Sequence, residues 1–296
     1  MPKITIKKPA ITIIGAGRLG SAMASALSRK GYPVNTLVSR KRITLEKAAA
    51  ALDVPVRLLV AKDINHLQLS ELTLITTPDD QVPKVVRSLT KLESVGSIAL
   101  HTSGALSSQT LAPLADRGWH IGSVHPLISV SGNEMEANIF EGAFWCVEGD
   151  KKALRMARQI VHDLDGKSFS VKAESKPLYH AAAVMTSGNV TALFDVSIDM
   201  LSKCGITRRE ARKILLPLLQ STVDNLQTRT PAQALTGTFS RGDVGTVQRH
   251  LAALSGANVS LARSLYCLLG LKSLNLAEAN RLDPVIAKRI RRLLKQ

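Results

Sequence analysis

The sequence predicts an α/β chain, in which a mostly parallel sheet covered by helices over residues 1–172 precedes an all-helical domain over residues 173–296. Short β-branched runs alternate with amphipathic stretches in the first part, a pattern typical of a parallel sheet with helices on its faces. After about residue 172 only helical patterns remain. Two domains also suit a chain of 296 residues, because one domain commonly takes roughly 150.

The composition is that of an ordinary globular protein. Hydrophobic residues make up 45% and charged residues 21%, which excludes a disordered or fibrous chain. Cys146, Cys204 and Cys267 lie far apart. This spacing excludes a disulfide scaffold and a cysteine zinc cluster, and favours a reducing, cytoplasmic compartment. No stretch approaches the ~18 uninterrupted apolar residues of a membrane span, so we expect no membrane.

The predicted elements of the first domain begin with a β-branched run at residues 10–15, followed by a helix from about Arg18 to Lys30. Further apolar segments predict strands at 33–38, 56–60, 72–76, 97–100, 119–124 and 143–147. Helical patterns lie between most of them, for example at 43–52, 80–88 and 151–164.

The second domain carries clear helix start signals. Pro177 opens a long helix that we expect to run to about Lys203. Thr207-x-x-Glu210 is a capping box for the next helix. Three further helices and a basic terminal helix are predicted to begin near 231, 243, 257 and 284.

A glycine pattern follows the first predicted strand and opens the first helix. Residues 15–20 read G-x-G-x-x-G, and this context makes them a Rossmann-like dinucleotide fingerprint. Gly15 allows the tight turn, Gly17 lets the backbone approach a pyrophosphate, and Gly20 lets helix and strand pack closely. Arg18 and Leu19 complete the predicted cofactor loop. The alternative is a structural glycine turn without a ligand.

The choice of cofactor is predicted from the end of the second strand, about 20 residues on. NAD-binding proteins usually place an acid there to accept from the ribose 2′-hydroxyl. This chain has Ser39 and Arg40, followed by two more cations. A 2′-phosphate would find a hydroxyl and positive charge, so we expect NADP. Thr77 and Pro78, after the fourth strand, are expected neighbours of the nicotinamide half.

Two further strand ends carry polar side chains. Ser103 follows the fifth strand and His125 ends the sixth. The carboxyl ends of neighbouring parallel strands converge, so a hydroxyl and an imidazole there can relay a proton to a carbonyl oxygen. In the alternative interpretation, Ser103 closes a turn and His125 bonds to backbone.

The start of the long helix is the other catalytic candidate. Lys176, His180, Ser187 and Thr191 fall roughly on one helical face. Lys176 or His180 could donate a proton, and Ser187 could bind substrate. A solvated lysine and a core histidine are the alternative.

The loop 236–243 contains Arg241, a candidate clamp for a substrate carboxylate. Formal net charge is +16, which suits anionic partners. Nucleic acid is a weaker candidate, because the chain has few aromatic residues for stacking and no single basic stripe.

The order of these features resembles the 6-phosphogluconate dehydrogenase-like superfamily. The strand ends with Ser103 and His125 are similar to those of prephenate dehydrogenases, and the helix with Lys176 is similar to the lysine helix of ketopantoate reductases. The segments 176–183 and 235–243 resemble the bacterial Rossmann-like family with a helical C-terminal domain of unknown function. The resemblance implies an NADP-dependent oxidoreductase, related to pyrroline-5-carboxylate reductase, that forms a homodimer through the helical domain.

The leading hypothesis is hydride transfer to or from a small carboxylated keto, hydroxy or imino metabolite. A non-catalytic NADP-binding sensor or partner protein is the alternative, and a nucleic-acid binder is the third. The sequence identifies neither the substrate nor the direction of reaction.

Overall fold

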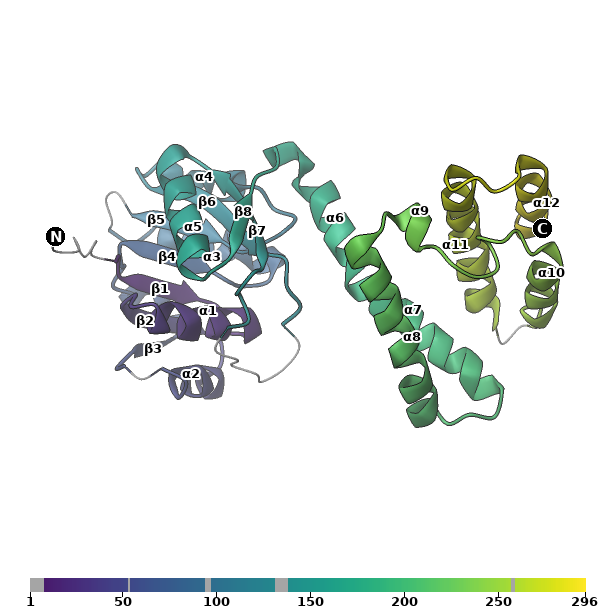
Figure 1. Cartoon of the computed structure of the whole chain (residues 1–296). Helices are drawn as coiled ribbons and strands as arrows, with labels where there is room; N and C mark the ends of the chain where they lie inside the picture. Colours follow the sequence, from purple (N-terminus) through teal and green to yellow (C-terminus); the bar gives the residue numbers. More distant parts are fainter. Residues whose placement is uncertain (1–7, 53, 94–96, 131–137, 257–258) are drawn as a thin grey trace, which may run out of the picture. The chain divides into compact units, whose positions relative to one another are not determined.

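A computed structural model describes residues 8–52, 54–93, 97–130, 138–256 and 259–296. The chain divides into two compact units, Met1–Ser187 and Gly188–Gln296. The first is the predicted Rossmann-like sheet with its helices, and the second is helical (Figure 1). The domain boundary predicted at 172/173 lies just before the last helix of the first unit and stays a prediction.

The described strands of the first unit form a sheet in the order β3-β2-β1-β4-β5-β6-β7-β8. Neighbours from β3 to β6 are parallel, β6 and β7 are antiparallel, and β7 and β8 are parallel. The strands are β1 Ile11–Ile14, β2 Val34–Ser39, β3 Arg57–Val60, β4 Leu72–Ile75, β5 Ile98–His101, β6 His120–Pro126, β7 Phe144–Gly149 and β8 Lys167–Phe169.

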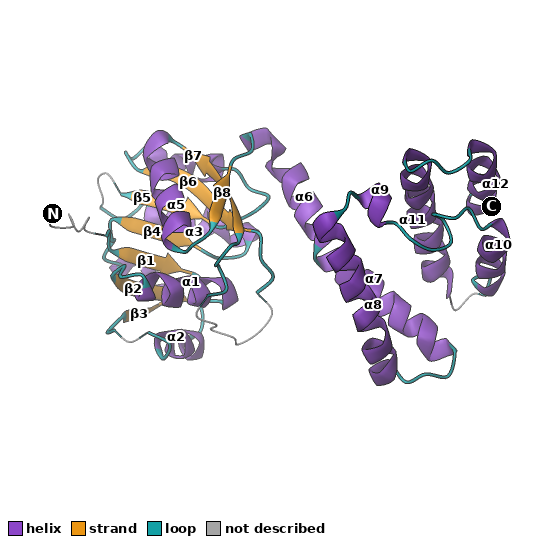
Figure 2. Ribbon diagram, viewed as in Figure 1, coloured by secondary structure: helices purple, strands orange, loops and turns teal. Residues whose placement is uncertain are grey.

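Helices cover both faces of this sheet (Figure 2). One apolar cluster joins α1, α2 and α5 to the sheet, with Met23 fully buried at its centre. The other cluster joins α3 and α4 to the opposite face. The helices are α1 Arg18–Arg29, α2 Arg42–Ala49, α3 Val82–Leu89, α4 Ala112–Ala115, α5 Lys151–Asp163 and α6 Lys176–Thr186.

The long helix predicted from Pro177 to Lys203 is interrupted. Ser187 has φ −113° and ψ −79°, outside the regular helical region, so it separates α6 from α7 Gly188–Lys203. The interruption falls before Gly188, a residue of low helix propensity. Lys176 and His180 therefore share α6, whereas Thr191 lies on another helix of the other unit.

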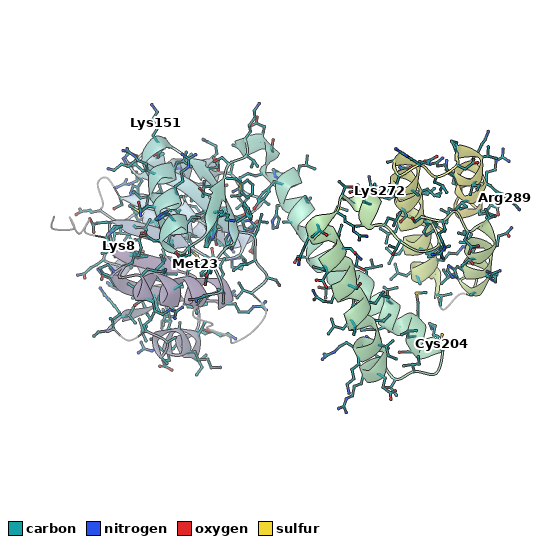
Figure 3. The ribbon with its side chains drawn as sticks, viewed as in Figure 1. Lys8, Met23, Lys151, Cys204, Lys272 and Arg289 are labelled. Carbon is teal, nitrogen blue, oxygen red and sulfur yellow. The ribbon has the colours of Figure 1, made fainter. Side chains whose placement is uncertain are left out.

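The second unit begins with α7 and α8 Arg208–Thr228, which pack against each other. The predicted capping box is confirmed, since the Thr207 hydroxyl accepts from the backbone of Glu210. A small apolar cluster then joins the helices near the C-terminus. Polar side chains such as Arg289 project outward (Figure 3). These helices are α9 Pro231–Ala234, α10 Val244–Ala253, α11 Ser260–Ala279 and α12 Pro284–Leu294.

One helical stretch in the described part of the chain, Ala173–Lys203, is long and apolar enough by composition to cross a membrane. Its mean hydropathy is 1.2, and only 6% of its most apolar window is buried. Length and composition alone are weak grounds for a membrane span. What the stretch does establish is an exposed apolar surface along α6 and α7.

Candidate functional site

The turn between β1 and α1 requires its glycines. Gly15 has φ +112°, and a Cβ there would lie 2.8 Å from the carbonyl carbon of Thr76. A Cβ on Gly20 would lie 2.2 Å from the Gly15 carbonyl oxygen. A Cβ on Gly17 would meet nothing within 4 Å, so its backbone faces open space. This arrangement leaves room for a phosphate beside the start of α1.

A cavity of about 570 Å³ opens beside this turn. Six of the predicted cofactor residues line it, namely Gly15, Gly17, Ser39, Arg40, Thr77 and Pro78. Arg18 is exposed at the start of α1, and Leu19 packs against the core. Gly20 is buried under the turn, so its role is helix–strand packing. As ligand contacts, these residues remain predictions.

The cavity has features that sequence reasoning missed. Lys84 and Ser88 line it from α3, beside Lys41, one of the two cations noted after Arg40. None of the described lining residues is acidic. The Thr77 hydroxyl is buried without a hydrogen-bond partner among the described residues. A cavity with three cations, no carboxylate and an unsatisfied hydroxyl suits a phosphorylated dinucleotide.

A histidine–tyrosine pair lies at the end of β6. His125 Nδ1 is 2.7 Å from the hydroxyl of Tyr179 on α6, and the two rings meet edge to face. The ring of His180 lies 5.4 Å from that of His125. Burial lowers the pKa of His125 to about 4, aided by the positive potential of His180, Lys176 and His101. His125 is therefore neutral at physiological pH.

Gly104 lies under both imidazoles. A Cβ on Gly104 would lie 2.3 Å from His180 Nδ1 and 2.9 Å from His125 Nε2. Both nitrogens therefore approach the same point of the loop after β5. His180 Nδ1 is also buried without a hydrogen-bond partner in the described part of the chain. The two imidazole nitrogens thus converge beside Gly104, which makes both histidines candidates for acid–base chemistry.

Lys176 is buried with no exposed surface. Its Nζ donates to the Ser123 hydroxyl at 2.6 Å and to the Ser103 carbonyl oxygen at 3.1 Å. Burial lowers the pKa of Lys176, against the opposing effects of Cys146, Glu148 and Asp79. The ammonium thus ties α6 to the ends of β5 and β6. Its predicted direct role in catalysis stays a prediction.

The hydroxyl of Ser103 serves the turn after β5. It accepts from the backbone N–H of Ala105 at 3.2 Å and of Leu106 at 2.9 Å. This is the turn-closing geometry given above as the alternative to catalysis. The half-buried Glu148 carboxylate extends the same polar cluster, because it accepts from Ser108 and Ser123.

The predicted substrate-binding residues fall in separate places. Ser187 ends the first unit. Arg241 is exposed in a loop of the second unit, before Asp243, whose side chain caps α10 by accepting from the Thr246 N–H. Gly242 in this loop has φ +67° and packs on Ile286. The loop is therefore a tightly built turn with one exposed guanidinium.

Comparison with known families agrees with this architecture. Residues 3–126 match a Rossmann-like domain, and residues 143–273 match a domain of unknown function (DUF2520). The chain therefore carries a Rossmann-like domain followed by this second domain. The resemblance inferred from segments 176–183 and 235–243 is thereby confirmed. No curated protein matches the chain.

Solved structures share the fold at low sequence identity. A Bacteroides fragilis protein provisionally named NADP oxidoreductase is 21% identical, covering 90% of this chain and 98% of its own, with a TM-score of 0.75. A Thermotoga maritima protein is 22% identical, covering 92% and 100%, with a TM-score of 0.72. Plasmodium falciparum pyrroline carboxylate reductase, solved with NADP bound, is 12% identical, covering 97% and 99%, with a TM-score of 0.56.

Proposed function

We propose that the protein is an NADP(H)-dependent oxidoreductase acting on a small carboxylated keto, hydroxy or imino metabolite. The observation that carries this proposal is the cavity at the glycine turn, with three lining cations and no lining carboxylate. An acid at the end of β2 would favour NAD, and Ser39 and Arg40 stand there instead. The NADP oxidoreductase and NADP-bound reductase with the same fold support it.

Different residues of the cavity would bind different parts of the cofactor. The open backbone at Gly17 and the start of α1 would meet the pyrophosphate. Arg40 and Lys41, with Lys84 from α3, would neutralise a 2′-phosphate. The unpartnered Thr77 hydroxyl would bond to the nicotinamide half. When bound, the cofactor supplies or accepts the hydride.

The histidines at the neighbouring strand ends would act on the substrate. His125 Nε2 and His180 Nδ1 converge beside Gly104, and a hydrogen bond from one of these imidazoles would hold the carbonyl oxygen or imino nitrogen. A hydrogen bond to that atom stabilises the charge that develops during hydride transfer. Lys176 and Ser103 hold the loop that carries Gly104. Arg241 and Ser187 are proposed to bind the substrate carboxylate.

The proposed partners of the protein are a small anionic substrate and a second copy of the chain. Its proposed location is the cytoplasm. Support for a homodimer through the helical domain is the apolar surface exposed on α7 and α8. On these helices the exposed apolar side chains are Val190, Leu193, Met200, Ile214, Leu216, Leu218, Val223 and Leu226. So much exposed apolar surface on neighbouring helices is typical of an interface.

Titration of the purified protein with NADPH and NADH, followed by nicotinamide fluorescence, tests the cofactor. We expect NADPH to bind at least tenfold more tightly, and Arg40→Asp to abolish this preference. Arg42→Asp is the matched control, because Arg42 lies nearby and does not line the cavity. A preference for NADH would overturn the NADP assignment, and no binding of either would overturn the oxidoreductase.

A panel of keto acids, hydroxy acids and cyclic imines then separates the enzyme from the NADP-binding sensor. Turnover of one member that is lost in His125→Gln, with NADPH affinity retained, supports the enzyme. NADPH binding without turnover of any member would favour the sensor.

A further inference from the structure

Tyr179 forms a hydrogen bond with His125 that sequence reasoning did not predict. The Tyr179 hydroxyl lies 2.7 Å from Nδ1, with ring centroids 5.7 Å apart and an interplanar angle of 86°. The opposite nitrogen, Nε2, faces the backbone of Gly104 and the ring of His180. Tyr179 thus bonds to His125 on the side away from the proposed reacting atom.

The direction of this hydrogen bond follows from its length and partners. A separation of 2.7 Å lies at the short end of the range of about 2.7–3.2 Å for N–H donors and suits a hydroxyl donor. The thiol of Cys146 is the other polar group beside the Tyr179 hydroxyl. Sulfur is a weak acceptor, so the imidazole nitrogen is the better acceptor for the phenolic proton. On this chemistry Tyr179 donates its proton to Nδ1.

The surroundings hold Tyr179 in this orientation. The buried thiol of Cys146 lies beside both Tyr179 and the backbone of Val171. The ring of Phe169, at the end of β8, lies edge-on against Tyr179 at 5.7 Å. Burial raises the pKa of the Tyr179 hydroxyl, so it keeps its proton.

We propose that Tyr179 is a positioning residue that fixes neutral His125 in the tautomer with its proton on Nε2, so that His125 meets the substrate as a hydrogen-bond donor. Which imidazole nitrogen carries the proton is set by the hydrogen bond that the other one makes. A neutral imidazole donor polarises a carbonyl group without first being charged. The part concerning substrate rests on the proposed function, whereas the tautomer itself does not.

The groups that face His125 favour its neutral form. Lys176 and His180 lie on α6 and His101 lies at the end of β5, and each of them disfavours a charge on His125. Tyr179 and Cys146 stay protonated, because burial raises the pKa of both. A neutral histidine with one fixed hydrogen bond has one preferred tautomer.

Nitrogen NMR of the full chain labelled at histidine tests the assignment directly. At pH 7.5 we expect His125, identified by the signals lost in His125→Gln, to show a protonated Nε2 and an unprotonated Nδ1. Tyr179→Phe should mix the two tautomers. The matched control is Tyr266→Phe, which removes the hydroxyl from a Tyr–His pair in the other unit and should leave the His125 signals unchanged.

A protonated Nδ1 in the parent protein would overturn the proposal, even if Tyr179→Phe failed to fold. Unchanged His125 signals in a folded Tyr179→Phe variant would also overturn it. Where turnover is found, we expect Tyr179→Phe to lower kcat about tenfold to hundredfold, with little change in KM or NADPH affinity. An altered tautomer with unaltered kcat would overturn the catalytic part. Absence of NADPH binding would instead overturn the proposed function and leave the tautomer standing.

Discussion

Two tyrosine–histidine pairs with nearly the same geometry lie in different parts of the chain. His125 and Tyr179 are 2.7 Å apart at the hydrogen bond and 5.7 Å between ring centroids. The corresponding distances for His250 and Tyr266, on α10 and α11, are 2.9 and 5.6 Å. Both pairs meet at 86°.

Their surroundings differ in every other respect. The first pair lies over the backbone of Gly104, beside His180 and above the buried ammonium of Lys176. His250 is exposed on the outer face of α10. The hydrogen bond is thus common to both pairs. Burial, neighbouring cations and a closely packed backbone distinguish the surroundings of His125, and such surroundings are more frequent at functional sites.

The largest expected effect comes from disturbing the close packing of Gly104 against His125 and His180. Gly104→Ala places a Cβ 2.3 Å from His180 Nδ1, so both imidazoles must move. We expect kcat to fall at least ~100-fold, because small displacements of catalytic groups are that damaging. The free energy of unfolding should drop by about 1–3 kcal/mol. Steady-state kinetics and urea denaturation measure the two effects.

Gly188→Ala is the control for this change, because its Cβ would meet nothing within 4 Å. Its unfolding free energy should stay within about 0.5 kcal/mol of the parent. If Gly104→Ala were as active and stable as Gly188→Ala, the histidines would not be held as described.

The second change removes the positive charge of Lys176, which acts on His125. Lys176→Met leaves the Ser123 hydroxyl and the Ser103 carbonyl without their donor. Each unsatisfied buried group costs about 1–3 kcal/mol, partly offset because the desolvated ammonium is gone. We expect a net loss of roughly 2 kcal/mol and a higher pKa for His125, by urea denaturation and NMR titration.

Lys172→Met, at an exposed position of the same segment, should change stability by less than about 0.5 kcal/mol. Equal stability of the two lysine variants would show that Lys176 does not anchor the strand ends.

The smallest expected effect is on the loss of stability at acidic pH. The folded chain keeps His125 neutral down to about pH 4, whereas the unfolded chain protonates it near pH 6.5. The unfolded state thus binds more protons in this window, so stability falls as pH drops from 6.5 to 4. His125→Gln should reduce this fall by roughly 1–2 kcal/mol, after allowing for partial exposure of the ring. Unfolding free energies at both pH values measure it.

If the stability of His125→Gln fell as steeply with acid as that of the parent, the burial of His125 would not be the cause of the fall.

Much of the fold was predictable because its signals are local. The β-branched runs, the glycine turn and the Thr207 capping box each lie within a few residues. β8 was missed, because three residues with only one apolar side chain carry no periodicity. The interruption at Ser187 was also missed, because no proline marks it.

The candidate site was less predictable, because its geometry depends on contacts distant in sequence. His125 and Lys176 were predicted as polar groups near a strand end and a helix start. Nothing local shows that Lys176 is buried against Ser123, 53 residues away. Tyr179 bonds to His125 across 54 residues, and Lys84 reaches the cavity from α3. Tyr179 directly precedes His180, and no local pattern distinguishes it from its neighbours on α6.

The position of β1 inside the sheet has a consequence for synthesis on the ribosome. β1 pairs with β2 on one side and with β4 on the other, and the Gly15 turn packs on Thr76. A nascent chain therefore cannot complete its dinucleotide cradle until β4 has emerged. His125 waits longer for its partner, since Tyr179 follows more than fifty residues later. The glycine turn can thus form well before the His125–Tyr179 pair, which needs nearly the whole first unit.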